Sequence, residues 1–98
     1  MSVQLFIQGD CVELAGGIHF SNVLRWLARL DTLLNNKKAG VMYVDFKKLQ
    51  TADASALALM ITLLRHAHSS GIKINYLNVP EHLLRIAKLY GVLDLLPG

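Results

Sequence analysis

The order of strand-like and helix-like segments along the chain decides its fold class. Residues 3–8 alternate apolar with polar side chains, which is the period-two pattern of a strand. A Gly-Asp turn follows, and residues 11–15 are again strand-like, so this stretch predicts a hairpin. Residues 41–46 and 72–77 are two further strand-like segments, and the first of them is apolar along nearly its whole length.

Helical periodicity occupies the segments between and after these strands. Ser21 is the expected N-cap of the first helix, and its core face carries Val23, Leu24, Leu27, Leu30 and Leu34. A second helix is expected over residues 54–70, and a third from Pro80 to Tyr90. The order β-β-α-β-α-β-α predicts one α/β domain over residues 1–98, with a mixed sheet of about four strands covered by three to four helices.

The composition excludes several classes of protein. With 98 residues, of which 53% are hydrophobic and 17% charged, the chain is too apolar for a disordered protein. Its most apolar run, residues 54–64, is shorter than the ~20 residues that span a bilayer. The first ten residues lack the features of a signal peptide, so a cytoplasmic protein is expected, and the single cysteine, Cys11, agrees with a reducing compartment.

The sequence lacks the common motifs of catalysis and cofactor binding. It contains no GxxxxGK[ST], GxGxxG or GxSxG pattern. His66 and His68 are two residues apart on an expected helix and point in different directions, while His19 and His82 lie in different elements. We therefore expect no catalytic residue, no cofactor and no metal ion. The ten lysine and arginine residues are spread over every element, so nucleic-acid binding is not expected either.

The start of the second helix is the most informative part of the chain. Asp53 is a good N-cap, which places Ser55 in the first turn, where free N–H groups and the positive end of the helix dipole would stabilise a phosphate. Ser55 is therefore a candidate phosphorylation site. The alternative is that Ser55 is an ordinary residue of a first helical turn.

The rest of this helix is unusually poor in charge. Its expected core stripe consists of Leu57, Met60, Ile61, Leu64 and Ala67. The opposite stripe consists of Ser55, Ala58, Leu59, Thr62, Arg65, His66 and Ser69. No charge occurs between Asp53 and Arg65, which is typical either of a docking surface or of a deeply buried helix. Under the first interpretation, the partner-binding candidates are Thr51, Ser55, Leu59, Thr62 and His66.

These residues resemble the hallmark of the STAS domain family, whose best-known members are anti-sigma-factor antagonists. The hallmark is an apolar strand that ends in Asp and a hydrophobe, followed by Asp-Ser-Ser-Gly-Leu at a helix start. Here the corresponding stretch is VMYVDFKKLQTADASALALM, in which Asp53, Ser55 and Leu57 match the motif's aspartate, its phosphorylatable serine and its first core leucine. Ala54 and Ala56 replace the other serine and the glycine.

The C-terminal stretch NVPEHLLRIAKLYGVLDLLPG is similar to the end of MlaB-type STAS subunits of Mla ABC phospholipid transporters. This resemblance implies a non-enzymatic cytoplasmic subunit that binds an MlaF-like ATPase, in a complex with a membrane permease, without inserting into the membrane itself. Such a complex would help to maintain outer-membrane lipid asymmetry. The alternative is an anti-sigma-factor antagonist that is switched by phosphorylation of Ser55.

Overall fold

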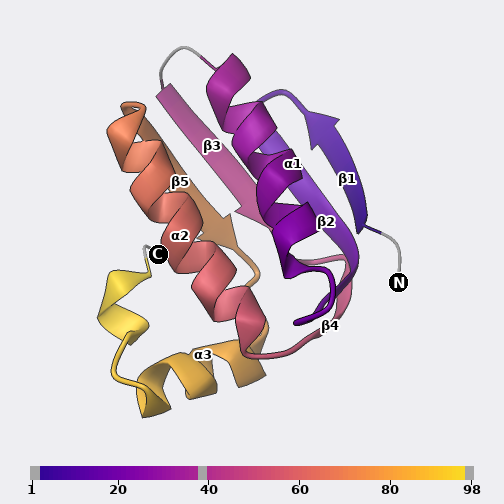
Figure 1. Cartoon of the computed structure of the whole chain (residues 1–98), viewed down its shortest axis with the longest axis vertical. Helices are drawn as coiled ribbons and strands as arrows, with labels where there is room; N and C mark the ends of the chain where they lie inside the picture. The colour runs from indigo at the N-terminus through magenta and orange to yellow at the C-terminus, as the bar shows by residue number, and fades with distance from the viewer. Residues whose placement is uncertain (1–2, 38–39, 97–98) are drawn as a thin grey trace.

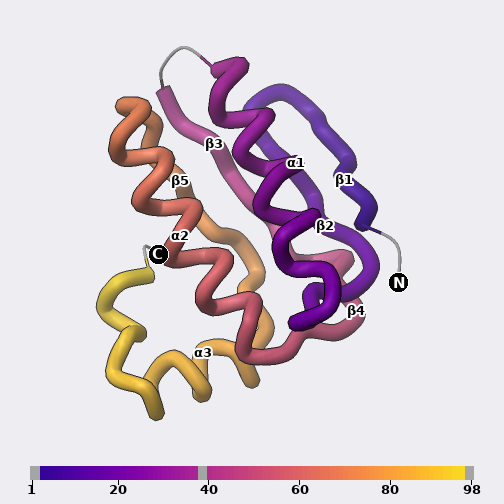
Figure 2. The backbone as a smooth tube through the Cα atoms, viewed as in Figure 1, coloured from indigo at the N-terminus to yellow at the C-terminus, as the bar shows by residue number. Residues whose placement is uncertain are grey.

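The computed structural model describes residues 3–37 and 40–96, and it forms a mixed sheet with two helices lying side by side across one face (Figure 1). The strands are β1 (Val3–Gln8), β2 (Cys11–Ile18), β3 (Gly40–Asp45), β4 (Leu49–Ala52) and β5 (Ile72–Leu77). The helices are α1 (Val23–Asn36), α2 (Ser55–Ser69), α3 (Glu81–Leu89) and the 3-10 turn η1 (Leu93–Leu95). The smooth trace in Figure 2 shows α3 beyond the carboxyl end of β5.

The sheet confirms the predicted α/β class, but the element order is β-β-α-β-β-α-β-α. The antiparallel hairpin of β1 and β2 is joined by β3 and β4, which both run parallel to β2, and β5 pairs with β3 in parallel. The expected order lacked β4. This strand of four residues contains a single large apolar side chain, Leu49, and two exposed polar ones, so its sequence carries no alternating pattern that predicts a strand.

The core lies between the sheet and the two helices on its face. Alternate residues of β2, β3 and β5 point toward the helices, and they are Val12, Leu14, Met42, Val44, Ile72, Ile74 and Tyr76. The Tyr76 hydroxyl donates a hydrogen bond of 2.6 Å to the backbone carbonyl of Met60 on α2. Burial raises the pKa of Tyr76, which therefore stays neutral while it ties α2 to the sheet.

Helix α1 begins one residue later than predicted, and its core face includes Trp26, which was not among the expected core residues. Ser21 lies in the preceding turn, and Asn22 occupies the N-cap position. Trp26 is fully buried beside Leu30, whereas Leu24, which was expected in the core, is 77% exposed. The core face is set by the spacing from Trp26 through Leu30 to Leu34, and this spacing turns Leu24 toward solvent.

Helix α2 buries a wider arc than its sequence indicates. Leu57, Met60 and Ala67 are buried as expected, but Leu59 and Leu63 are buried as well, at 3% and 1% exposure. The assignment of Leu59 to the outward stripe is therefore wrong. The wider burial results from tertiary packing. Because α1, β5 and α3 all contact α2, side chains outside a single helical stripe are also buried.

Candidate functional site

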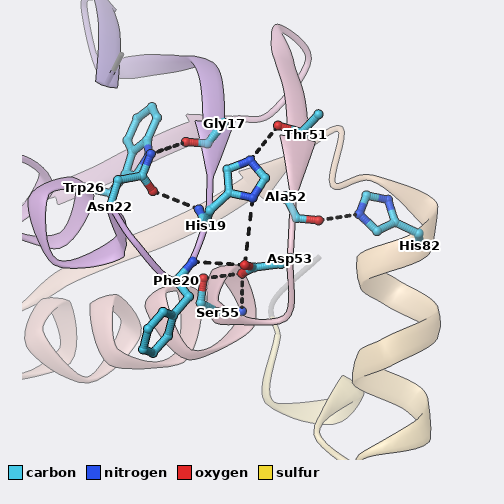
Figure 3. A network of polar contacts seen from close by, with 10 residues as sticks. All are labelled: Gly17, His19, Phe20, Asn22, Trp26, Thr51, Ala52, Asp53, Ser55 and His82. Carbon is cyan, nitrogen blue, oxygen red and sulfur yellow. Dashed lines mark hydrogen bonds and ion pairs between the residues drawn. The ribbon is translucent and has the colours of Figure 1, made fainter. Parts of the chain in front are cut away.

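The carboxyl ends of β2 and β4 meet the starts of α1 and α2, and a polar network connects the four elements there (Figure 3). Parallel strands that pair with one another bring their carboxyl ends to the same edge of a sheet, and the helices that follow begin at that edge. The network therefore joins segments that are more than 30 residues apart in sequence, such as Phe20 and Asp53.

Asp53 is the centre of this network. Its carboxylate accepts hydrogen bonds from the backbone N–H of Phe20 at 2.9 Å, from the backbone N–H of Ser55 at 2.9 Å and from the Ser55 hydroxyl. The helix itself begins at Ser55, with Ala54 in the N-cap position, but Asp53 still satisfies a free N–H of the first turn. The bond from the Ser55 hydroxyl, followed by the bond from the Phe20 N–H, lowers the pKa of Asp53.

Asp53→Asn is expected to make the stability of the domain less dependent on acidic pH. Because the folded-state pKa of Asp53 lies below its unfolded value, the ionised carboxylate contributes its full stabilisation above pH ~4 and loses it as the pH falls through the folded-state pKa. The free energy of unfolding, measured with urea between pH 7 and pH 3, should therefore differ most between parent and variant at pH 7. A difference that stays constant down to pH 3 would contradict this role for Asp53.

Two histidines bind the strand end that precedes Asp53. The Nε2 atom of His19 lies 2.7 Å from the Thr51 hydroxyl, and its Nδ1 atom lies 3.8 Å from the Asp53 carboxylate. On the other side, Nε2 of His82 on α3 donates to the carbonyl of Ala52 at 3.0 Å. Side chains from the β2–α1 loop and from α3 therefore both bind the end of β4.

A buried asparagine and tryptophan set the shape of the β2–α1 loop. The side-chain amide of Asn22 and the indole N–H of Trp26 both donate to the carbonyl of Gly17, each at 2.8 Å. Asn22 also accepts the backbone N–H of His19 at 2.8 Å. Gly17 lies next to the register shift between β2 and β4, where the regular ladder is interrupted. These bonds fix the loop that carries His19 and Phe20 into the network.

The Ser55 hydroxyl is engaged by a carboxylate. Its side chain is half-buried, and its hydroxyl donates to Asp53, while the nearby His19 is bonded to Thr51. No histidine accepts the Ser55 proton among the residues that the structure describes. Over the same residues, no group of three or more potential ligands could hold a metal ion.

The structure separates the residues of the helix-start motif, Asp53, Ser55 and Leu57, and those that were predicted to bind a partner. Thr51, Asp53 and Ser55 lie together in the network, whereas Leu57 and Leu59 are buried in the core. Thr62 is half-buried one to two turns further along α2. His66 is exposed, lies about 16 Å from Ser55 along the helix axis, and its Nδ1 atom is hydrogen-bonded to the Asp31 carboxylate on α1 at 2.7 Å.

An exposed apolar surface next to the network was missed by the sequence analysis. Phe20 is 86% exposed beside Ser55 in Figure 3, and Leu24 is 77% exposed in the first turn of α1. Leu24 shares a helical stripe with Asp31, and the hydrogen bond between Asp31 and His66 connects this stripe with the stripe of α2 that contains Thr62. We define the docking face as Phe20, Leu24, Ser55, Ala58 and Thr62.

The docking face contains no charged residue. Little in the sequence indicated that Phe20 and Leu24 are exposed. The members of the docking face are apolar or neutral. Leu24 lies at the start of α1, Ser55 and Ala58 lie at the start of α2, and Phe20 lies in the loop before α1. The two helices lie side by side in Figure 1. Exposed apolar patches occur at contact sites with other proteins, at membrane-binding sites and at ligand-binding grooves. Phe20 follows a strand and precedes a turn, and Leu24 has the spacing of a core residue, so neither could be identified as exposed from the sequence.

Comparisons with solved structures show which fold this is. The anti-sigma factor antagonist SpoIIAA in its unphosphorylated form matches with a TM-score of 0.71 at 17% identity, over 97% of this chain and 85% of that chain. The phosphorylated form, from Bacillus, matches with a TM-score of 0.66 at 17% identity, over 97% and 88%. An anti-sigma factor antagonist from Mycobacterium paratuberculosis gives 0.68 at 11% identity, over 98% and 82%. At these identities the likeness establishes the fold alone.

Sequence comparison identifies the family. No protein of curated function matches the chain by sequence. The described residues contain no helix with the length and apolar character needed to cross a membrane. STAS domains are typically non-enzymatic proteins that mediate protein–protein contacts. A family model described as Mlab, STAS domain, matches residues 2–97, so this chain belongs to the STAS domain family, among the domains of MlaB type.

Proposed function

We propose that this chain is the STAS subunit that binds the MlaF-like ATPase of an Mla-type ABC phospholipid transporter. In this role it is a cytoplasmic protein, held at the inner membrane through a complex that includes a permease, and it supports the assembly and activity that keep the outer membrane asymmetric. The observation that carries the proposal is the uncharged docking face around Phe20 and Leu24, in a chain that matches the MlaB-labelled family model.

The docking face would act as a clamp on the ATPase. An apolar partner surface would cover Phe20 and Leu24, while the small side chain of Ala58 would allow close approach to α2. Binding would stabilise the ATPase conformation that presents this surface, because a partner shifts a conformational equilibrium only by its difference in affinity for the two states. The subunit would contribute no catalytic group.

Co-expression with the ATPase subunit encoded in the same genome tests the proposal. The two chains should co-purify through size-exclusion chromatography, and the isolated STAS chain should show no ATP binding by titration calorimetry. A matched control is co-expression with a kinase-type anti-sigma factor from the same genome. Stable binding to the anti-sigma factor and none to the ATPase would overturn the proposal.

A second candidate function is that of an anti-sigma-factor antagonist that is switched by phosphorylation of Ser55. The observation that favours it is the Ser55 hydroxyl at the start of α2, bonded to Asp53, which can accept its proton when a phosphoryl group is transferred. The phosphate would then place about −1.5 to −2 charges against Asp53. Because Asp53 also holds the Phe20 N–H, modification would disturb the docking face directly.

Ser55→Asp is expected to weaken partner binding and to cost some stability as well. From the sequence alone, a first-turn carboxylate should be tolerated because of the helix dipole. The contact with Asp53 changes this expectation, since the new carboxylate would repel the Asp53 carboxylate and lose the hydroxyl donor. Thermal unfolding and partner affinity should be measured together for the parent, Ser55→Ala, Ser55→Asp and Gln8→Glu, a control that adds the same charge to an exposed strand position.

The outcomes separate the roles of Ser55. Ser55→Ala should bind nearly as well as the parent if the hydroxyl serves only as a modification site, and Gln8→Glu should match the parent in both measurements. Equal affinity of the parent and Ser55→Asp would remove Ser55 from the interface and contradict the phosphorylation switch.

A further inference from the structure

The edge strand β1 is unused by the function proposed above. It pairs with β2, and no further strand pairs with its other side among the residues that the structure describes. Figure 1 shows β1 at the outer edge of the sheet, with α1 lying between it and α2. None of the residues of the docking face belongs to β1. An open edge of this kind presents N–H and C=O groups that can pair with another extended chain.

The sequence of β1 lacks the features that usually protect an edge strand. Its six residues, VQLFIQ, include no charged residue and no proline, and its register with β2 contains no bulge. The strand at the opposite edge, β5, carries the exposed Lys73. In β1, Phe6 is 48% exposed and Ile7 is 57% exposed. A strand added here would therefore cover apolar surface in addition to pairing the open backbone groups.

The hairpin determines which backbone groups of β1 are open. Gln8 and Cys11 face each other across a two-residue turn, which closes with a hydrogen bond between these two residues. Bonded and non-bonded positions alternate along an antiparallel pair. Leu5 and Ile7, three residues and one residue before Gln8, therefore direct their N–H and C=O groups away from β2, toward the open edge.

The side chains of β1 form a palindrome centred on Phe6. The sequence around it is Gln-Leu-Phe-Ile-Gln, so the polar, apolar and aromatic positions read alike in both directions. A two-fold axis at Phe6 places Phe6 opposite its own copy, Leu5 opposite Ile7, and Gln4 opposite Gln8. Every side chain then faces one of the same kind, on the same face of the sheet. This pattern is the one that antiparallel pairing with a second copy requires.

The same register fits the open backbone groups. Leu5 of one copy would exchange hydrogen bonds with Ile7 of the other in both directions. Moving the axis to Leu5 would break the palindrome. It would also require the carbonyl of Val3, which already accepts a hydrogen bond of 3.0 Å from the Arg29 guanidinium. The backbone and the side chains therefore select the same axis.

The charge beside Phe6 is balanced within the chain. The Nζ atom of Lys48 lies 5.2 Å from the centroid of the Phe6 ring, and it pairs with the Glu13 carboxylate at 3.8 Å. Glu13 is the residue of β2 that faces Phe6 in the hairpin. Since β1 itself contains no charge, two copies of the strand place no like charges at facing positions.

We propose that two copies of this chain associate through β1, in an antiparallel strand pair centred on Phe6 that joins the two sheets into one. The second copy is the occupant that fits, because an uncharged palindromic strand is complementary to itself. A contact made by one strand pair is small for a specific interface, so we expect a weak dimer with a Kd on the order of 0.1–1 mM. The proposal goes beyond ATPase binding, and its test uses this chain alone.

Disulfide cross-linking of the full chain tests the position of the axis. In a Cys11→Ser background, Phe6→Cys should form a linked dimer on oxidation with diamide, because facing residues of a non-bonded pair have Cα atoms about 4.5 Å apart, within the range of a disulfide. Gln4→Cys is the matched control on the same face of β1. Its two copies would lie about 13 Å apart, so it should give less than about a tenth as much dimer on a non-reducing gel.

Sedimentation equilibrium tests association of the parent chain. Its average mass should rise toward that of a dimer between about 10 µM and 1 mM. Ile7→Lys places a charge on the open edge and should weaken association at least about tenfold. Gln50→Lys, which adds the same charge at an exposed position of β4, should stay within about twofold of the parent. A parent that stays monomeric at the highest concentration, equal cross-linking of the two cysteine variants, or equal association of the two lysine variants would each overturn the proposal.

Discussion

Leu59→Glu is expected to unfold the domain, whereas Ala58→Glu leaves it folded. Leu59 lies in the core and is 3% exposed, whereas Ala58, the preceding residue on the same helix, is exposed. The substitution removes about 1.5–3 kcal/mol of apolar burial and also forces a carboxylate into a site without a partner, which costs several kcal/mol more. The sum is comparable with the whole stability of a small domain, about 5–15 kcal/mol.

Urea unfolding followed by circular dichroism measures this effect on both variants. Ala58→Glu is the matched control, because it introduces the same side chain one position away on the same helix. Its midpoint should lie close to that of the parent. A Leu59→Glu variant that unfolds at the parent's midpoint would show that α2 is rotated and that Leu59 points outward, as its sequence pattern indicated.

Four of the five described strands and the order of the three α-helices could be predicted because their signals are local. Residues 3–8 and 72–77 are strands with the predicted bounds, since alternation of apolar and polar side chains is visible in the sequence itself. The orientation of α2 could not be predicted in the same way. Without charges between Asp53 and Arg65 nothing in the sequence marks the solvent side, and the buried arc is set by contacts with α1, β5 and α3.

The same distinction applies to the candidate site. The role of Asp53 at the start of α2 was predicted in part, because capping acts over two or three residues: Asp53 accepts the Ser55 N–H, although Ala54 occupies the N-cap position. The bond from the Ser55 hydroxyl to Asp53 was not predicted. His19 and His82 approach the end of β4 from positions about 30 residues away in either direction, so their contacts depend on the complete fold. β4 itself, the element that brings them together, was absent from the predicted order.

Partner binding is expected to fall most when charge is placed on the docking face. Thr62→Arg and Phe20→Glu each introduce a charge where the face is otherwise uncharged, and a charge without a partner in the centre of an interface costs about 2–5 kcal/mol. This corresponds to a loss of roughly 30-fold or more in affinity for the ATPase. Both residues have enough exposed surface for the fold to accept the change, since Phe20 is 86% exposed and Thr62 is half-buried.

Titration calorimetry with the ATPase subunit, performed beside thermal unfolding, separates loss of binding from loss of structure. Gln4→Arg is the control for Thr62→Arg, because Gln4 is exposed on β1 and lies outside the docking face. It should bind like the parent. If Phe20→Glu and Thr62→Arg both bind normally, the ATPase contacts another surface. If only Phe20→Glu weakens binding, the partner contacts the β2–α1 loop and does not contact α2. The proposed clamp, which involves both the loop and α2, would then be wrong for α2.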